Sequence, residues 1–366
     1  MKPSNEIISF HSDAAGCIRK AINGTPQDKE LSMNHEATET IQSPAWRILI
    51  MFAVVLSMTG CSLFPKNWGK DEGYIWCNAR YLDLTSPEYK ATGSANPALD
   101  KRLRLAQQGY LYAVLGAVVL QKEQESVDKH FNLPPYVELD SSQSDRSGFQ
   151  ASVFKIYTDA DKANLKEVVI AFRGTDQFWT DYSKHNLHPL PKQYEPARQY
   201  VLEVSEKFEG KRLIVAGYSL GGGLAMHVLN NDQIAEQTNI SEAWAFNSSP
   251  RTGEPVKVDS RLHLISTKGE ILNFPRKFLR KGPSSLGALD RNFSDDFDLI
   301  DASSAYLHAR FVLARQMLVF ADLAYFEQSG RNPEYISPPL AILQQANAPE
   351  GCSGSYKTNL TAWGRL

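Results

Sequence analysis

The sequence predicts an α/β fold with a mostly parallel central sheet flanked by helices. Short apolar segments typical of buried strands alternate with segments of helical periodicity along much of the chain. One such strand, residues 213–216, runs directly into Gly217-Tyr218-Ser219-Leu220-Gly221 and then into a helical pattern. With 366 residues, 42% of them hydrophobic, the chain is large enough to bury both faces of such a sheet in one domain.

The elements before this segment follow in chain order. Residues 99–125 have a broad apolar face at helical spacing, which predicts a helix packed on the sheet. Residues 148–156 alternate apolar and polar side chains, as in a half-buried strand, and residues 159–164 supply a turn. A more continuously apolar strand is expected at 167–172, near the centre of the sheet. Residues 194–210 predict a helix that ends at a glycine.

The elements after the segment continue the alternation. Strands are expected at residues 243–246 and 261–267. A loop-rich stretch, 273–305, then leads to a final helix from residue 309 to about 326.

The serine segment has the Gly-x-Ser-x-Gly pattern of a nucleophile elbow between a strand and a helix. A sharp turn would strain the backbone of Ser219, so that Gly217 and Gly221 must lack side chains to avoid collision. The following helix would aim its first N–H groups, including that of Leu220, at a developing oxyanion. The alternative is a glycine-rich turn that only packs a helix tightly against a sheet.

A serine nucleophile needs a base and an acid, which in the α/β-hydrolase fold follow it as acid and then histidine. Of the eight histidines, His308 follows every other candidate and lies at a loop-to-helix junction, with a helix-capping or surface role as the alternative. Glu270 directly follows the predicted penultimate strand and is the first choice for the acid. Five aspartates remain rivals, although their crowding is more typical of a solvated acidic loop: Asp290, Asp295, Asp296, Asp298 and Asp301.

Three segments together, residues 168–176, 217–222 and 246–251, resemble the class 3 lipases. The resemblance covers roughly residues 145–325 and implies an α/β-hydrolase that cleaves lipid esters without a cofactor. Two positions depart from the family pattern: Tyr218 stands where histidine is commonest, and Glu270 stands where aspartate is usual.

The resemblance also implies further site residues. Thr175 would supply the second oxyanion contact beside the N–H of Leu220, and the aromatic stretch after it would form a lid over the site. Ordinary packing is the alternative for those aromatics, Phe178, Trp179 and Tyr182.

The sequence therefore predicts a serine hydrolase of lipase or phospholipase type, with phospholipid preferred. A short-chain esterase or thioesterase, or a non-catalytic envelope lipoprotein on a hydrolase scaffold, are the alternatives. The formal net charge of -2 gives no electrostatic reason to expect nucleic acid, and no metal-ligand spacing occurs. The cationic and apolar stretch 274–282 is interpreted either as a membrane contact or as a solvated face.

The N-terminal residues predict the cellular location of the protein. Residues 48–58 form an apolar run after Arg47, too short to span a bilayer comfortably but typical of a signal peptide. The pair Thr59-Gly60 before Cys61 resembles a bacterial lipobox, which implies a lipidated Cys61, and Ser62 after it favours the outer membrane. A short signal anchor is the alternative.

These patterns divide the chain into three parts. Residues 1–60 form the leader with its lipoprotein signal peptide, 61–95 an irregular N-terminal segment, and 96–366 the class 3 lipase-like hydrolase domain. In the mature chain, Cys77 and Cys352 are candidates for a disulfide.

Overall fold

The computed structural model describes residues 97–123, 129–174, 192–253, 257, 259–273, 276, 294–297, 303–332 and 334–345. Within this part of the chain, seven strands form one sheet in the order β1-β2-β3-β4-β5-β6-β7. The β1–β2 and β2–β3 pairs are antiparallel, and every pair from β3 to β7 is parallel. The strands are β1 (Val137–Ser144), β2 (Gln150–Tyr157), β3 (Leu165–Phe172), β4 (Arg212–Tyr218), β5 (Ile240–Phe246), β6 (Leu262–Thr267) and β7 (Ser294–Phe297).

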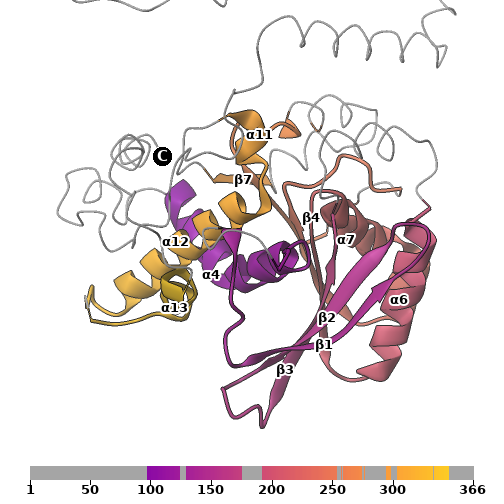
Figure 1. The fold of residues 1–366 in the computed structure, drawn as a ribbon, viewed down its shortest axis with the longest axis horizontal. Coiled ribbons are helices and arrows are strands. Elements are labelled where there is room, and N and C mark those ends of the chain that lie inside the picture. Colours follow the sequence, from indigo (N-terminus) through magenta and orange to yellow (C-terminus); the bar gives the residue numbers. More distant parts are fainter. Residues whose placement is uncertain are drawn as a thin grey trace, which may run out of the picture. The chain divides into compact units, whose positions relative to one another are not determined.

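Helices cover both faces of the sheet (Figure 1). Helices α4 (Pro97–Val118), α12 (Arg310–Gln328) and α13 (Pro338–Gln345) share one hydrophobic core with the sheet. Helices α6 (Tyr194–Lys207), α7 (Leu220–Asn230) and α8 (Asp232–Gln237) share the other. Successive residues of the central strands alternate between these two cores, which is why the strands are apolar at nearly every position. The predicted α/β fold with a mostly parallel central sheet flanked by helices is confirmed.

Several boundaries and short elements differ from the prediction. Helix α4 ends at Val118 rather than near residue 125, because the following chain turns and the Gln121 side chain bonds the backbone of Phe131 at 2.8 Å and 3.2 Å. Strand β1 was not predicted, since its sequence VELDSSQS is mostly polar and its shape comes from antiparallel pairing with β2. Helices α8 and α13 were not predicted either.

The acidic stretch near residue 295 also differs. Asp295 and Asp296 lie in β7, the edge strand that pairs with β6, so the prediction that these two residues belong to a loop is wrong. Parallel pairing with β6 supplies the strand conformation there, against the low strand propensity of aspartate.

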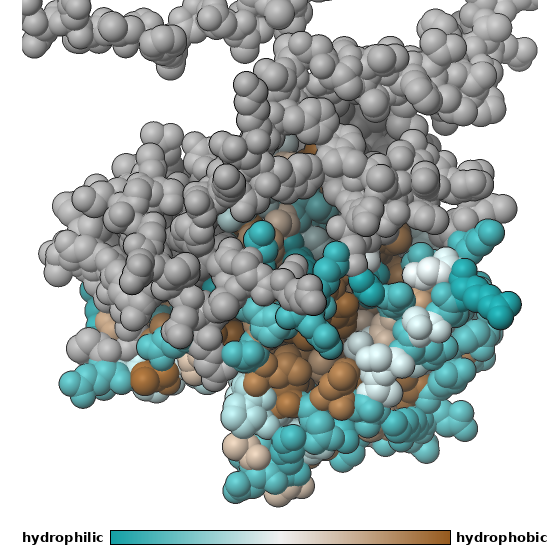
Figure 2. All heavy atoms as spheres, viewed as in Figure 1, coloured by the Kyte–Doolittle hydropathy of each residue, from teal (hydrophilic) through white to brown (hydrophobic). Residues whose placement is uncertain are grey.

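On the face shown in Figure 2, hydrophilic side chains dominate the outer parts of the described molecule, and apolar side chains gather toward its middle. Among the described residues, none of the helices combines the length and the apolar character needed to cross a membrane. The signal-peptide run and the boundaries predicted at residues 60 and 95 lie outside the described residues.

Candidate active site

Ser219 lies at a sharp elbow between β4 and α7. Its backbone has φ 55° and ψ −117°, a conformation that non-glycine residues rarely adopt. The neighbouring strand holds this conformation, because the Ser219 N–H donates to the carbonyl of Phe246 at 2.9 Å. Its carbonyl in turn accepts from the N–H of Ser249 at 2.8 Å. The backbone strain is thus sustained by bonds to the end of β5 and to the loop after it.

The elbow depends on glycines that allow three segments to touch. A Cβ at Gly217 would lie 2.2 Å from the backbone of Gly221, and a Cβ at Gly221 would lie 2.2 Å from the carbonyl oxygen of Phe172. At Gly174 the nearest atom would be the carbonyl oxygen of Tyr218, at 2.4 Å. Separations this short require glycine, so the predicted requirement at 217 and 221 agrees with the geometry.

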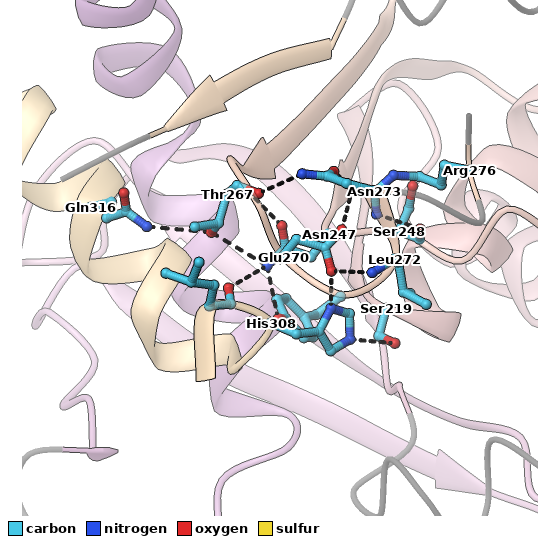
Figure 3. Close-up of polar contacts among 12 residues, drawn as sticks. Ser219, Asn247, Ser248, Thr267, Glu270, Leu272, Asn273, Arg276, His308 and Gln316 are labelled. Carbon is cyan, nitrogen blue, oxygen red and sulfur yellow. Dashed lines mark hydrogen bonds and ion pairs between the residues drawn. The ribbon is translucent and has the colours of Figure 1, made fainter. Parts of the chain in front are cut away.

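The structure brings together the three residues predicted to form a triad (Figure 3). Nε2 of His308 lies 3.2 Å from Oγ of Ser219, and Nδ1 of His308 lies 2.6 Å from Oε2 of Glu270. All three side chains are buried, with residue exposures of 4% for Ser219, 7% for His308 and 2% for Glu270. These distances suit proton transfer from the serine to an imidazole whose other nitrogen is held by a carboxylate.

His308 reaches this position from a short turn. The single-turn helix α11 (Ser304–Leu307) begins at Ser303, whose hydroxyl caps the N–H of Tyr306 at 3.3 Å. His308 then ends that turn, directly before α12. A bond from the N–H of Ile271 to the carbonyl of Ser304, at 3.0 Å, ties the turn to the loop that carries the carboxylate.

Glu270 follows β6 and has a full set of donors. Its Oε2 accepts from the N–H of Leu272 at 2.8 Å as well as from His308, and its Oε1 contacts the guanidinium of Arg276. Burial alone would raise the pKa of Glu270, but the charges of His308 and Arg276 and these hydrogen bonds outweigh it and lower the pKa. The carboxylate is therefore ionised at neutral pH, as an acid that orients an imidazole requires.

Asn247 was not predicted to have a role, although it belongs to a segment that carries the family resemblance. It is fully buried at the end of β5, with a left-handed φ of 41°. Its Oδ1 accepts from the N–H of Thr267 at 2.8 Å. Its Nδ2 donates to the hydroxyl of Tyr218 at 3.0 Å and to the carbonyl of Leu307 at 3.3 Å. One side-chain amide thus joins β4, β5, β6 and the α11 turn.

The partners of Asn247 are chain neighbours of the candidate triad. Tyr218 directly precedes Ser219, and its ring centroid lies 5.4 Å from that of His308. Burial, the largest cause, raises the pKa of Tyr218 well above its ordinary value, so its hydroxyl stays neutral. The neutral, buried ring of Tyr218 therefore packs beside the imidazole of His308.

Arg276 differs from its predicted setting. The interpretation of stretch 274–282 as a membrane contact or a solvated face is wrong for this residue, because Arg276 is only 3% exposed and pairs with Glu270. The rest of that stretch lies outside the described residues, as do Thr175, the lid aromatics, Cys61, Cys77 and Cys352, and the rival acids Asp290, Asp298 and Asp301.

Comparison with known proteins gives one family match. Residues 127–250, about a third of the chain, match the model of the Tle-like phospholipase domain, which is described as phospholipase-like. The matched region includes Ser219 and ends before Glu270 and His308. It is not the class 3 lipase family, so membership of that family stays a prediction.

A search of curated proteins finds no match. Among solved structures, the chain is similar to brefeldin A esterase, a bacterial homologue of human hormone-sensitive lipase, at 15% identity over 74% of this chain and 75% of that one, with a TM-score of 0.23. The match at residues 127–250, on a chain with an α/β fold and a mostly parallel sheet, supports a lipid ester hydrolase in general.

Proposed function

We propose that this chain is a serine hydrolase that cleaves carboxylic esters of lipids, with phospholipids preferred over triglycerides. The observation that carries the proposal is the unbroken series of contacts from the Ser219 hydroxyl through His308 to Glu270, placed at a strained elbow. The match of residues 127–250 to a phospholipase-like domain supports the choice of phospholipid.

In this proposal, Oγ of Ser219 attacks the ester carbonyl carbon while its proton passes to Nε2 of His308. The Nδ1–H of the resulting imidazolium stays bonded to Glu270, whose charge stabilises it. When the tetrahedral intermediate collapses, the leaving alcohol takes the proton from Nε2 and an acyl-serine remains. Water, deprotonated by His308, then releases the fatty acid and restores Ser219.

A tetrahedral intermediate forms when the acyl-serine is made and again when water cleaves it. The oxyanion of each needs hydrogen-bond donors. Leu220 is the first residue of α7, and the first N–H groups of a helix lack partners within it. We assign the N–H of Leu220 as one donor and, from the family resemblance, Thr175 as the second.

We also propose that the protein is anchored through a lipidated Cys61 to the outer membrane of a bacterial envelope. The support is the sequence alone, from the apolar run 48–58 and the small residues before Cys61. An enzyme tethered to a bilayer meets phospholipid as its most abundant ester, which agrees with the proposed substrate.

The test is fatty-acid release by the purified, detergent-solubilised chain from phosphatidylethanolamine, phosphatidylglycerol, triolein and a soluble short-chain ester. Phospholipids should be cleaved faster than triolein. Ser219→Ala should lower every rate by a factor on the order of 10⁴ or more and abolish fluorophosphonate labelling, because nucleophile and base act as a unit. The fold should persist, since the change leaves almost no cavity.

Equal turnover by Ser219→Ala and the parent would contradict the nucleophile assignment. Cleavage of the short-chain ester alone would indicate an esterase. A folded parent that neither hydrolyses any ester nor labels would indicate a non-catalytic envelope protein.

A further inference from the structure

Arg276 is a buried cation that the proposed reaction does not use. It lies in the turn after β6, where its N–H donates to the carbonyl of Leu272 at 2.9 Å. Its guanidinium contacts three acceptors: Oε1 of Glu270, Oδ1 of Asn273, and the carbonyl oxygen of Ser248 at 2.9 Å. Removing a guanidinium from water is costly, so such a residue needs a compensating set of partners, and these three supply it.

The two carboxylate oxygens of Glu270 have separate partners. Oε2 accepts from His308 and from the N–H of Leu272, whereas Oε1 contacts Arg276. A glutamate has one more side-chain torsion than an aspartate, and its terminal torsion is broad. Without a partner on Oε1, the carboxylate could rotate about that torsion and lose its alignment with the imidazole.

Arg276 also connects the acid to the nucleophile. The carbonyl that it binds belongs to Ser248, and the next residue, Ser249, donates its N–H to the carbonyl of Ser219 at 2.8 Å. A continuous series of bonds therefore runs from the Glu270 carboxylate through the guanidinium to the backbone of the elbow. This series joins the acid to the serine segment through the carboxylate oxygen that His308 does not contact.

We propose that Arg276 is a positioning residue, which holds Glu270 in the rotamer that orients His308 and links that carboxylate to the elbow of Ser219. This role rests on the proposed function, because it acts through the acid of the proposed triad. Among the described residues, the charged and titratable groups facing Glu270 are His308 from the α11–α12 junction, Arg276 from its own turn, and Tyr218 from β4.

The test compares Arg276→Lys, Arg276→Gln, Glu270→Gln and the double variant Glu270→Gln/Arg276→Gln. A matched control is Arg261→Gln at the other end of β6. Arg261 likewise pairs with a carboxylate, Asp259, at 2.6 Å and donates to a backbone carbonyl at 3.0 Å, but its side chain is 40% exposed. The measurements are kcat and KM for a soluble short-chain ester across pH, the rate of fluorophosphonate labelling, and the thermal unfolding temperature.

We expect Arg276→Gln to lower kcat roughly 10- to 100-fold, the effect of one charged hydrogen bond, with KM changed far less. The acid limb of its pH profile should move to higher pH, because loss of the facing cation raises the pKa of Glu270. Arg276→Lys keeps the positive charge but not the planar guanidinium that reaches several acceptors at once. The acid limb should therefore stay in place, while kcat falls in part. Arg261→Gln should change neither kcat nor the position of the acid limb.

If Arg276 acts through Glu270, then adding Arg276→Gln to the Glu270→Gln variant should lower kcat by less than about a further threefold. If Arg276→Gln does not fold, Arg276→Lys and the double variant, in which neither partner is left with an uncompensated charge, carry the comparison. The role would be overturned if Arg276→Gln lowered kcat by the same factor in the parent and in the Glu270→Gln variant. Folded Arg276 variants with the kcat and pH profile of the parent would overturn it as well. An inactive, unlabelled parent would overturn the proposed function itself, whereas an active parent with neutral Arg276 variants would overturn only this inference.

Discussion

The side-chain amide of Asn247 uses its donor and its acceptor in opposite directions, and this makes it hard to replace. Its oxygen accepts from the backbone of β6, while its nitrogen donates to the hydroxyl of Tyr218 and to the carbonyl of Leu307. Two of these partners directly precede Ser219 and His308. The geometry of the candidate triad therefore depends on a group that holds the residues directly before the serine and the histidine.

We predict that Asn247→Asp, which keeps the shape, lowers both activity and stability. A carboxylate cannot donate to the carbonyl of Leu307, and a buried negative charge would face that oxygen. The expected cost is about 2–4 kcal/mol in the free energy of unfolding, with kcat reduced by at least about tenfold. Denaturant unfolding and ester hydrolysis measure the two effects.

The matched control is Asn231→Asp. Asn231 caps α8 through an acceptor oxygen, 3.1 Å from the N–H of Ile234, and aspartate retains that acceptor. Stability and kcat should stay within about 0.5 kcal/mol and twofold of the parent. An Asn247→Asp variant as stable and active as this control would contradict the role of the amide.

Single residues also show where sequence reasoning stops. Ser219, Glu270 and His308 could be selected because the elbow has a local pattern and the acid and base follow it in a fixed chain order. Asn247 and Arg276 have no such pattern. The partners of Asn247 are distant in sequence, and an arginine among lysines and aromatics resembles a surface residue. Only the three-dimensional neighbours reveal that Arg276 is buried.

At the scale of the elements, α4 approaches the sheet closely through small residues. A Cβ at Gly109 would lie 2.2 Å from the ring of Trp244, a fully buried side chain of β5. About two helical turns further along, a Cβ at Gly116 would lie 3.7 Å from Phe246, at ordinary contact distance. Close packing against Trp244 therefore requires a glycine at position 109, whereas the space around position 116 would also accept an alanine.

We predict effects of opposite sign for the two alanine substitutions. Gly109→Ala forces α4 or Trp244 to shift and should destabilise the protein by about 1–3 kcal/mol. Gly116→Ala fits without displacement and should stabilise it by about 0.5–1 kcal/mol, because alanine costs less entropy in a helix than glycine. Chemical unfolding of both variants checks the pair, and equal destabilisation would contradict the packing described for α4.

The elements that could be predicted are those whose sequence carries the signal themselves. Strands β3 to β6 are apolar runs, and α6, α7 and α12 have apolar faces. The strands that were missed, β1 and β7, are edge strands of polar composition whose conformation comes from pairing with a neighbour. Their signal lies in the partner strand, and a single sequence does not reveal which strand that is.

At the scale of the whole molecule, three groups of the candidate site follow the carboxyl ends of adjacent parallel strands, and His308 reaches the same edge from the α11 turn. Ser219 follows β4, Asn247 follows β5 and Glu270 follows β6. Open α/β sheets generally bind their ligands at this edge. The order of strands therefore accounts for how distant segments of the chain reach one site, and the chain order of the triad could be read in advance for the same reason.

The proposed attachment to a membrane is a property of the whole chain and gives the last prediction. Cys61→Ser should move the protein from the membrane fraction to the soluble fraction and prevent incorporation of labelled palmitate, because the acylated thiol is lost. Cys77→Ser should keep both the label and the membrane location. A Cys61→Ser chain that stays in the membrane with residues 1–60 attached would support a signal anchor instead.

The packing of α12 against α4 has a consequence for the order of folding. The two helices are far apart in the chain, as shown by the bond between Gln107 and Gln328, which spans 221 positions. We expect such long-range contacts to close after local hairpins such as β1–β2, because the entropy of closing the loop opposes them. His308 lies two residues before α12, so the imidazole should reach Ser219 only when α12 docks. A chain in which α12 has not docked would carry its serine without a base, and hydrolysis would begin only once this helix is in place.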